Sequence, residues 1–237
     1  MTSVIRTLGV IGGISWESTA LYYRLINRAV ASRLGGLHSA PLILHSLEFN
    51  EIAELQSAGK WDESGRILAR SAMGLERAGA EALVMTSNTM HHVAAAIEDA
   101  VKIPLIHIVD PVGRLLNLAG MRMVGLLGTS YTMELPFWRD RLARQFGIEV
   151  LTPEAEDRQL VHRVIFEELC VGQVREASRK EFVRVSESLA GRGAEAVILG
   201  CTEVGMLLGP KDVTVPVFDT TELHAEAAVN FILSGAL

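Results

Sequence analysis

The stretch Arg192-Gly-Ala-Glu-Ala-Val-Ile-Leu-Gly-Cys-Thr-Glu203 predicts a buried strand that ends in a sharp turn carrying a thiol. Its positions from Ala196 to Leu199 are apolar without polar alternation, which is typical of a parallel strand covered on both faces. Parallel strands of α/β folds present their chemistry at the carboxyl end. Cys201 stands at that end and is the first candidate for a catalytic residue.

The chain contains the same pattern a second time. Ala78-Gly-Ala-Glu-Ala-Leu-Val-Met-Thr-Ser-Asn-Thr89 puts Ser87 at the position equivalent to Cys201, 114 residues earlier. Two further pairs keep nearly this offset and the same order: Gly9-Val-Ile-Gly-Gly13 with Gly125-Leu-Leu-Gly-Thr129, and Ile103-Pro-Leu-Ile106 with Val215-Pro-Val-Phe218. The three echoes indicate two related halves.

We therefore predict an α/β fold of two pseudo-twofold-related units, each a mainly parallel sheet flanked by helices. Residues 1–109 and 215–237 would form the first unit, and residues 110–214 the second. We expect a cleft between them that sets Ser87 opposite Cys201. Two opposed groups are what an inversion of stereochemistry requires.

Composition excludes several classes of protein. The 237 residues are 49% hydrophobic and 21% charged, values typical of a folded globular protein. A net charge of −6 without a run of Lys or Arg argues against binding to nucleic acid or to an anionic membrane. No apolar run is long enough to span a membrane, and the start of the chain lacks the architecture of a signal peptide, so we expect a cytoplasmic protein.

Cofactor sites are not indicated. His91 and His92 are neighbours that would point about 100° apart on a helix, so they cannot chelate one ion together. Cys170 and Cys201 form no metal-binding spacing, and we expect Cys170 to be structural. No Lys follows a predicted strand at its turn, so we expect neither pyridoxal phosphate nor a metal.

Several polar residues near predicted strand ends are candidates for binding a ligand. Ser15 can cap the helix after the Gly12-Gly13 turn, which either binds an anion such as a carboxylate through backbone N–H groups or is a simple tight turn. Gln56 belongs to a segment that we expect to form a rim or lid. A helix beginning near Val204 would lower the pKa of Cys201 and favour its thiolate.

The sequence resembles the cofactor-independent aspartate/glutamate racemases, which form a larger group with hydantoin racemases and arylmalonate decarboxylases. The resemblance covers essentially the whole chain and is carried by these motifs: Gly12-Gly-Ile-Ser-Trp-Glu-Ser-Thr19, Ser87-Asn-Thr-Met-His91, Gly128-Thr129, Glu168-Leu-Cys-x-Gly172 and Gly200-Cys-Thr-Glu203. It implies a homodimer whose two cleft cysteines move the α-proton of an amino acid without pyridoxal phosphate. The second cysteine falls on Cys201.

The first cysteine of that pattern falls on Ser87, and a serine hydroxyl is a far poorer base than a thiolate. Three explanations stay open: a natural one-cysteine subgroup that favours one enantiomer, an engineered replacement of cysteine, or a reaction that needs one thiol, such as decarboxylation followed by protonation. A non-catalytic protein that binds amino acids or organic acids is a further alternative.

In the racemase mechanism that the resemblance implies, Cys201 moves the proton on one face of the substrate and Ser87 acts slowly on the other. The substrate's carboxylate and the carbanion-like transition state would be held by backbone N–H groups and side chains. The candidates for this binding are Ser15, Gln56, Asn88, Thr89, Thr129, Thr202 and Glu203. Arg179 and Lys180 are candidates for pairing with a side-chain carboxylate.

Overall fold

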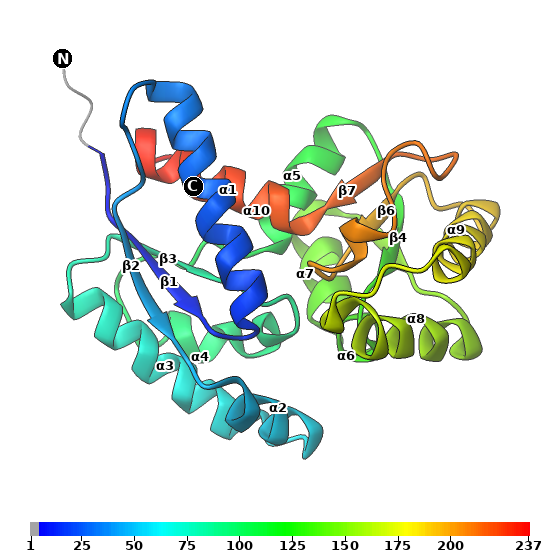
Figure 1. The fold of residues 1–237 in the computed structure, drawn as a ribbon, viewed down its shortest axis with the longest axis horizontal. Coiled ribbons are helices and arrows are strands. Elements are labelled where there is room, and N and C mark those ends of the chain that lie inside the picture. Colours follow the sequence, from blue (N-terminus) through cyan, green and yellow to red (C-terminus); the bar gives the residue numbers. More distant parts are fainter. Residues whose placement is uncertain (1–4) are drawn as a thin grey trace. The chain divides into compact units, whose positions relative to one another are not determined.

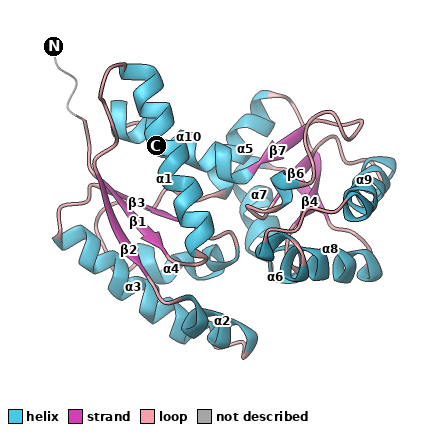
Figure 2. Ribbon diagram, in the orientation of Figure 1, coloured by secondary structure: helices cyan, strands magenta, loops and turns pink. Residues whose placement is uncertain are grey.

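The computed structural model describes residues 5–237 and divides into two compact units. The first contains the chain up to Ile108 together with His224–Leu237, and the second contains Val109–Leu223 (Figure 1). Each is built on a parallel β-sheet flanked by helices, and Figure 2 distinguishes strands from helices by colour.

The sheet of the first unit has, within residues 5–237, the strand order β2-β1-β3. Its strands are β1 (Leu8–Gly12), β2 (Leu42–Ser46) and β3 (Ala82–Met85), and β1 pairs in parallel with both neighbours. All three carboxyl ends therefore lie at one edge of the sheet. Beyond β3, Leu105 makes an isolated parallel bridge to Leu83.

Helices cover both faces of this sheet. They are α1 (Trp16–Leu34), α2 (Phe49–Ser57), α3 (Trp61–Arg77), the 3₁₀ turn η1 (Thr89–Val93), α4 (Ala94–Glu98) and the last helix, α10 (Thr220–Ser234). Alternate residues of β1 point to opposite faces, as the pleat requires. Leu8 packs in one cluster with side chains of α1 and α10, whereas Ile11 packs in another with side chains of α3.

The second unit repeats this plan with the strand order β5-β4-β6-β7 among the described residues. Its elements are α5 (Val109–Leu118), β4 (Met123–Leu127), α6 (Ser130–Glu134), α7 (Phe137–Phe146), β5 (Glu149–Leu151), α8 (Ala155–Glu167), the 3₁₀ turn η2 (Leu169–Val171), α9 (Glu176–Gly191), β6 (Val197–Leu199), the 3₁₀ turn η3 (Val204–Met206) and β7 (Val217–Asp219). β3 and β6 occupy equivalent places in the two sheets. Ser87 and Cys201 each follow the equivalent strand by two residues.

The boundary near the end of the chain differs from our expectation that residues 215–237 complete the first unit. β7 pairs with β6 in parallel, Val197 opposite Val217, so this segment belongs to the second sheet. Only the part of α10 from His224 onward packs with the first unit. There its apolar side chains join the cluster around Leu8 and Tyr22.

The apolar run of residues 103–109 predicts a strand, and this prediction is also wrong. Only the bridge at Leu105 forms. The sequence predicts that the next helix begins near Val112, after an extended Asp110, but α5 begins at Val109. Pro111 does not hold Asp110 in an extended conformation, because both residues lie in the first turn of α5. Proline is tolerated there, since the first N–H groups of a helix have no partner within it.

Two predicted helices are shorter than expected. The sequence predicts a helix over residues 135–146, and it forms as α7 from Phe137, because Leu135, the residue before Pro136, is extended as its position before a proline favours. Residues 130–134, expected as a polar turn, form the separate short helix α6. After Cys201 the chain forms only the three-residue turn η3. In residues 5–237, no helix is both long enough and apolar enough to cross a membrane.

Candidate functional site

The turn after β1 brings the backbone close to the chain after β2. Gly13 has φ of +85°, and a Cβ atom there would lie 2.1 Å from the carbonyl oxygen of Leu47. Only glycine fits both the conformation and the space. The Gly12-Gly13 turn is therefore required by the local packing of the sheet edge, whatever ligand it binds.

Hydroxyl groups connect this turn to the end of β3. Ser15 is the N-cap of α1, and its side chain accepts a hydrogen bond from the N–H of Ser18. Thr19 Oγ1 accepts from the N–H of Gly13 at 2.8 Å and lies 2.9 Å from Thr86 Oγ1. The residue before Ser87 is thus held to the glycine turn by a buried hydroxyl pair.

Ser87 is the half-buried residue of its turn. Its neighbours Thr86 and Asn88 are buried, as is Thr89, the first residue of η1. His91 lies 2% exposed beneath the turn, with Nδ1 2.7 Å from the carbonyl oxygen of Ser87. The polar residues predicted at this strand end are therefore brought together, and the Ser87 side chain is the one with partial access to solvent.

The second unit has an equivalent arrangement at its own sheet edge. Thr129 follows β4 as Ser15 follows β1, and it is the N-cap of α6, with its hydroxyl accepting from the N–H of Thr132. Thr202 lies half-buried in the turn after β6, next to Cys201. Both predicted residues therefore lie at the carboxyl edge that carries Cys201.

Cys201 is held by Glu203. Its thiol donates a hydrogen bond to Glu203 Oε2 at 2.9 Å, and the side chain is half-buried against the core of the second unit. Burial, followed by the charge of Glu203 and this hydrogen bond, raises the pKa of the Cys201 thiol well above its ordinary value. Our expectation of a lowered pKa is wrong, because no long helix starts beyond Cys201 and a carboxylate stands beside it instead.

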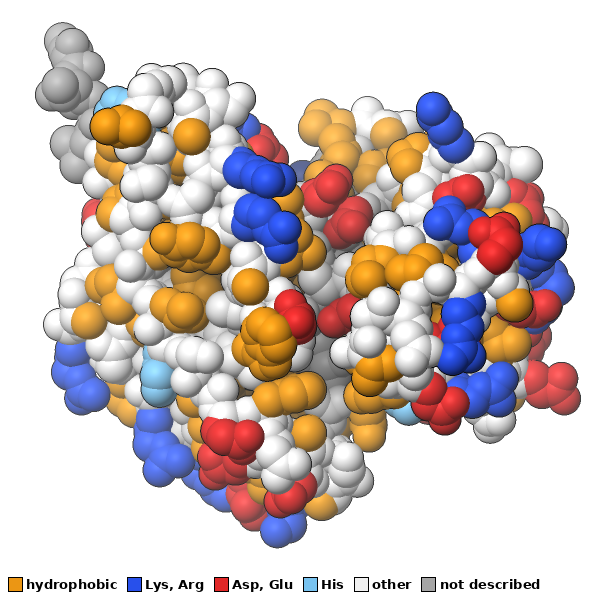
Figure 3. All heavy atoms as spheres, in the orientation of Figure 1, with side chains coloured by type: hydrophobic (Ala, Val, Ile, Leu, Met, Phe, Trp, Pro, Cys, Tyr) orange, Lys and Arg blue, Asp and Glu red, His pale blue; other side chains and the backbone are white. Residues whose placement is uncertain are grey.

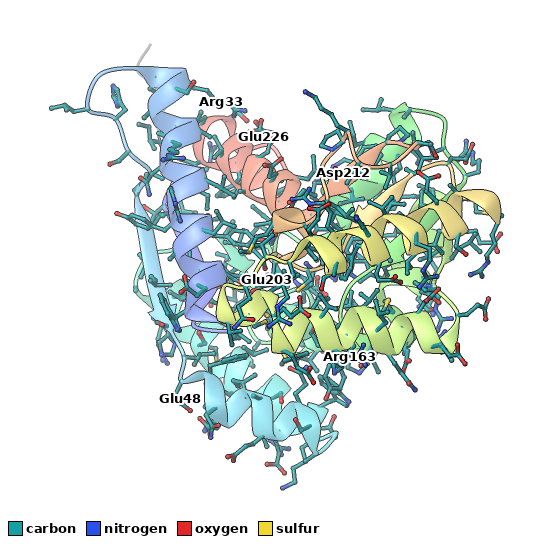
Figure 4. All side chains as sticks on the ribbon, turned by 45° about the vertical axis from the view of Figure 1, so that its right-hand side comes forward. Arg33, Glu48, Arg163, Glu203, Asp212 and Glu226 are labelled. Atoms are coloured by element: carbon teal, nitrogen blue, oxygen red, sulfur yellow. The ribbon has the colours of Figure 1, made fainter. Side chains whose placement is uncertain are left out.

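Glu203, labelled in Figure 4, also acts on the other cysteine. Cys170 lies exposed on η2, and partial desolvation, followed by the charge of Glu203, raises the pKa of its thiol to about 12. Cys170 is therefore not the packed structural residue that the sequence suggested. A second carboxyl group, Asp219, ends β7 at the same edge, caps α10 through the N–H of Thr221, and has its pKa raised by burial.

Two other residues predicted to bind the substrate, Gln56 and Arg179, have no described contact with the turns that carry Ser87 and Cys201. Gln56 is half-buried on α2, and its side chain has no contact that ties it to the end of β3 among the described interactions. Arg179 forms ion pairs with Glu176 and Asp212. Its charge is already shared between two carboxylates.

Three residues of the first unit were missed by sequence reasoning: Thr19, Thr86 and His91. Each occurs in a stretch that was noted for its polar residues, but their contacts join positions far apart in the chain, as between Thr19 and Thr86 and between His91 and His224. Their distance in sequence from a candidate residue could have indicated them. Thr86 directly precedes Ser87, His91 follows Ser87 by four residues, and Thr19 lies one helical turn after Ser15.

No group of three or more His, Cys, Asp or Glu side chains within residues 5–237 could hold a metal ion. His92 packs edge-on against the ring of Trp61, with ring centroids 4.8 Å apart, and burial lowers its pKa. On the face visible in Figure 3, acidic and basic side chains are interspersed and form no basic patch.

Comparisons with known proteins agree with this architecture. The model of the Asp/Glu/hydantoin racemase family matches residues 11–228. A candidate Asp/Glu racemase from Yersinia pestis is 48% identical, with a TM-score of 0.93 over 97% of this chain and 100% of that one. An aspartate racemase homologue from Pyrococcus horikoshii is 34% identical, with a TM-score of 0.83 over 96% of this chain and 99% of that one.

A more distant structure has the same fold. Glutamate racemase from Francisella tularensis, solved with D-glutamate, is 15% identical and has a TM-score of 0.64 over 97% of this chain and 82% of that one. The match of the family model to most of the chain, together with the two parallel sheets, leads to one conclusion. The chain belongs to the Asp/Glu/hydantoin racemase family.

Proposed function

We propose that the protein is a cofactor-independent amino-acid racemase that acts on aspartate or glutamate, with Cys201 as the group that moves the α-proton. The observation that carries the proposal is the 2.9 Å hydrogen bond from the Cys201 thiol to the Glu203 carboxylate. The names of the relatives, an aspartate racemase homologue and a glutamate racemase solved with D-glutamate, support the substrate class.

The first step follows from the protonation state of the thiol. Because the pKa of Cys201 is raised, the resting group is a neutral thiol, and a base must take its proton before it can act on a Cα–H bond. Glu203 is within hydrogen-bonding distance to be that base. The thiolate then removes the α-proton, and the reverse sequence returns a proton. We thus propose that Glu203 is a proton acceptor for Cys201, where the sequence had suggested a substrate-binding role.

The carbanion-like state needs hydrogen-bond donors at the substrate's carboxylate. We propose that these come from the turns at the two sheet edges: Ser15, Asn88, Thr89, Thr129 and Thr202. Preorganised donors of this kind are the largest contribution in many enzymes, and losing one costs about 10²–10³-fold in kcat. Ser87 would be the second proton-transferring group, acting slowly because its hydroxyl is almost never ionised near neutral pH.

Hydrogen–deuterium exchange at the α-carbon tests the proposal. In D₂O, we expect the protein to incorporate deuterium into one enantiomer of aspartate or glutamate faster than into the other, measured by proton NMR. Cys201→Ser should abolish the exchange with an unchanged circular dichroism spectrum. Binding of both enantiomers without exchange in either would contradict the proposal and favour an amino-acid-binding protein.

A second candidate function is decarboxylation followed by protonation on one face. It is favoured by the combination of one thiol at the paired positions, with serine at the other, and a raised thiol pKa, because a neutral thiol is suited to donate a proton to a carbanion. Release of CO₂ from a disubstituted malonate, without α-proton exchange in amino acids, would select this reaction.

The homodimer and the cytoplasmic location stay predictions. The dimer rests on the resemblance to the family, and light scattering coupled to size-exclusion chromatography would test it. The absence of pyridoxal phosphate rests on the lack of a lysine at the strand-end turns. Absorbance of the purified protein near 420 nm would contradict it.

A further inference from the structure

Among the buried polar groups that the proposed mechanism does not use, His91 has the most direct connection to a proposed catalytic turn. Its ring lies beneath that turn and is 2% exposed. Nδ1 is 2.7 Å from the carbonyl oxygen of Ser87, and Nε2 is 3.2 Å from the backbone nitrogen of Ile108. The two ring nitrogens therefore join the end of β3 to the residue before α5.

These contacts fix the tautomer of His91. A carbonyl oxygen only accepts hydrogen bonds, so Nδ1 must carry the proton that it donates to Ser87. The N–H of Ile108 only donates, so Nε2 must be the unprotonated acceptor. His91 is thus a neutral imidazole with its proton on Nδ1.

Packing around the ring keeps it in this orientation. The ring of His91 meets that of His107 edge-on, with centroids 4.6 Å apart, and that of His224 with centroids 5.6 Å apart. His224 is fixed in turn, because Nε2 lies 2.7 Å from the carbonyl oxygen of Ile106 and Nδ1 lies 2.8 Å from the hydroxyl of Tyr22. By the same reasoning as for His91, His224 carries its proton on Nε2.

The hydrogen bond to Ser87 has a geometric consequence for the next residue. In a planar trans peptide, the carbonyl oxygen and the following N–H point in opposite directions. Since the Ser87 oxygen points to His91, the N–H of Asn88 must point away from the buried ring. If this peptide plane rotated by half a turn, the Ser87 carbonyl oxygen would point where the Asn88 N–H points now. A carbonyl oxygen repels a carboxylate, whereas an N–H group donates a hydrogen bond to it.

We propose that His91 is a positioning residue that fixes the plane of the Ser87–Asn88 peptide and thereby the direction of the Asn88 N–H and of the Ser87 side chain. This inference rests on the proposed function, in which the turn binds the substrate's carboxylate. His91 does not touch the substrate. It acts through one hydrogen bond to the backbone of the turn.

Two substitutions separate the two contacts of the ring. In His91→Asn, the side-chain amide can occupy the place of Nδ1 and keep the hydrogen bond to Ser87. In His91→Gln, it can reach the place of Nε2 and keep only the contact with Ile108. The variants are therefore matched in polarity and differ in which bond they retain.

The kinetic experiment measures kcat and KM for α-proton exchange in both variants. We expect His91→Asn to keep kcat within about 3-fold of the parent and His91→Gln to lose about 10- to 100-fold in kcat with little change in KM, because a misdirected donor mainly affects the transition state. Equal losses in the two variants, with equal thermal stability, would overturn the proposal.

A measurement without substrate tests the same contact. Two-bond ¹H–¹⁵N NMR correlations should assign the proton of His91 to Nδ1 and that of His224 to Nε2. The backbone amide resonance of Asn88 should move in His91→Gln and stay near its position in His91→Asn. A proton on Nε2 of His91, or an Asn88 resonance that moves equally in both variants, would overturn the proposal.

The kinetic and the NMR measurements test this inference and the proposed function separately. If the parent protein exchanges no α-proton, the proposed function fails, and the NMR measurement alone decides whether His91 orients the peptide. If the parent is active and the NMR prediction fails, the role of His91 is wrong while the racemase proposal stands.

Discussion

The carboxylate of Glu203 has two opposing effects on the thiol of Cys201, to which it is hydrogen-bonded. Its charge raises the pKa of the Cys201 thiol, which reduces the amount of thiolate, and its oxygen is the acceptor that can take the thiol proton. These effects predict opposite outcomes when the carboxylate is removed. A single substitution therefore reveals which effect governs the reaction.

We predict that Glu203→Gln lowers the pKa of Cys201 and yet slows α-proton exchange. The pKa falls because a negative charge and a carboxylate acceptor are lost, and exchange slows because an amide is a poor proton acceptor, with about 10²-fold expected for a lost general base. In a Cys170→Ser background, Cys201 is the only thiol, and the pH dependence of alkylation by iodoacetamide reports its pKa.

The control for this experiment is Glu222→Gln, which removes an exposed carboxylate of α10. It should change neither the alkylation midpoint nor the exchange rate. Faster exchange in Glu203→Gln would mean that the carboxylate only suppresses the thiolate, and its role as proton acceptor would be wrong.

We also predict that Ser87→Cys increases racemisation in both directions. Ser87 and Cys201 follow equivalent strands, so a thiol at Ser87 would supply the second base that the family pattern carries there. General acid–base groups contribute about 10²–10⁴-fold, and the swap should cost about 1 kcal/mol or less of stability. Polarimetry measures the rate from each enantiomer.

Ser46→Cys is the matched control, because it puts an exposed thiol at the end of β2 instead of β3. It should leave racemisation unchanged. If Ser87→Cys also leaves the rate of racemisation unchanged while its circular dichroism spectrum is native, Ser87 has no part in the mechanism. That result would favour the one-thiol reaction.

At the residue scale, the sequence predicted where the candidate groups lie better than it predicted their chemistry. The apolar run before Cys201 ends at Leu199, so its place at a strand end followed from pattern alone. The direction of its pKa shift did not, because it depends first on burial of the thiol and then on the side-chain conformation of Glu203 two residues later. The contact of Thr19 with Thr86 depends on the pairing of β1 with β3. This pairing cannot be predicted from the residues near either position alone.

At the scale of elements, the turn between β1 and α1 depends on two features of Gly13: its positive φ and the closeness of Leu47. Gly36, after α1, shares only the first, since its φ is +57° and no atom lies within 4 Å of a Cβ built there. The two glycines therefore separate the cost of the conformation from the cost of the clash.

We predict that Gly36→Ala lowers the free energy of unfolding by about 1–2 kcal/mol, the cost of a left-handed conformation in a residue with a Cβ atom. Gly13→Ala should cost about 3 kcal/mol or more, because overpacking against backbone adds to the same conformational cost. Urea denaturation followed by circular dichroism measures both. Equal losses would mean that the turn moves away from Leu47 without difficulty.

Elements bounded by strong local signals were predicted within a residue, as with the strand expected from Ala196 to Leu199, which forms β6 from Val197 to Leu199. The segment 103–109 was misread because its apolar residues suit a strand, whereas most of them pack without extending the ladder beyond Leu105. Whether an apolar run pairs as a strand depends on its neighbours in space, which a single sequence does not contain.

At the scale of the whole molecule, the first unit is discontinuous in sequence and the second is continuous. α10 provides the apolar side chains that complete the core around Leu8 and Tyr22. Arg33 of α1 and Glu226 of α10 form an ion pair and lie side by side in Figure 4. The first unit therefore depends on residues that follow the entire second unit in the chain.

We predict that a chain ending at Leu223 keeps a folded second unit and loses the structure of the first. Hydrogen exchange followed by mass spectrometry should show fast exchange in β1 and β3 and slow exchange in β4 and β6. In a Trp16→Phe, Trp61→Phe background, the buried Trp138 is the only tryptophan, and its emission maximum should stay blue-shifted.

A chain ending at Ser234 is the control, because it keeps all of α10. It should match the full-length protein in both measurements. Slow exchange in β1 and β3 of the shorter chain would show that the first unit does not need α10.

The position of α10 has a consequence for synthesis in the cell. The strands of the first unit leave the ribosome early, but their covering helix arrives only after about 130 further residues, a delay on the order of 10 s at ordinary translation rates. The second unit is complete once Leu223 has emerged, and it can close while the first still exposes apolar surface to chaperones. Of the two units, the one whose strands are synthesised first is thus the last to finish its core.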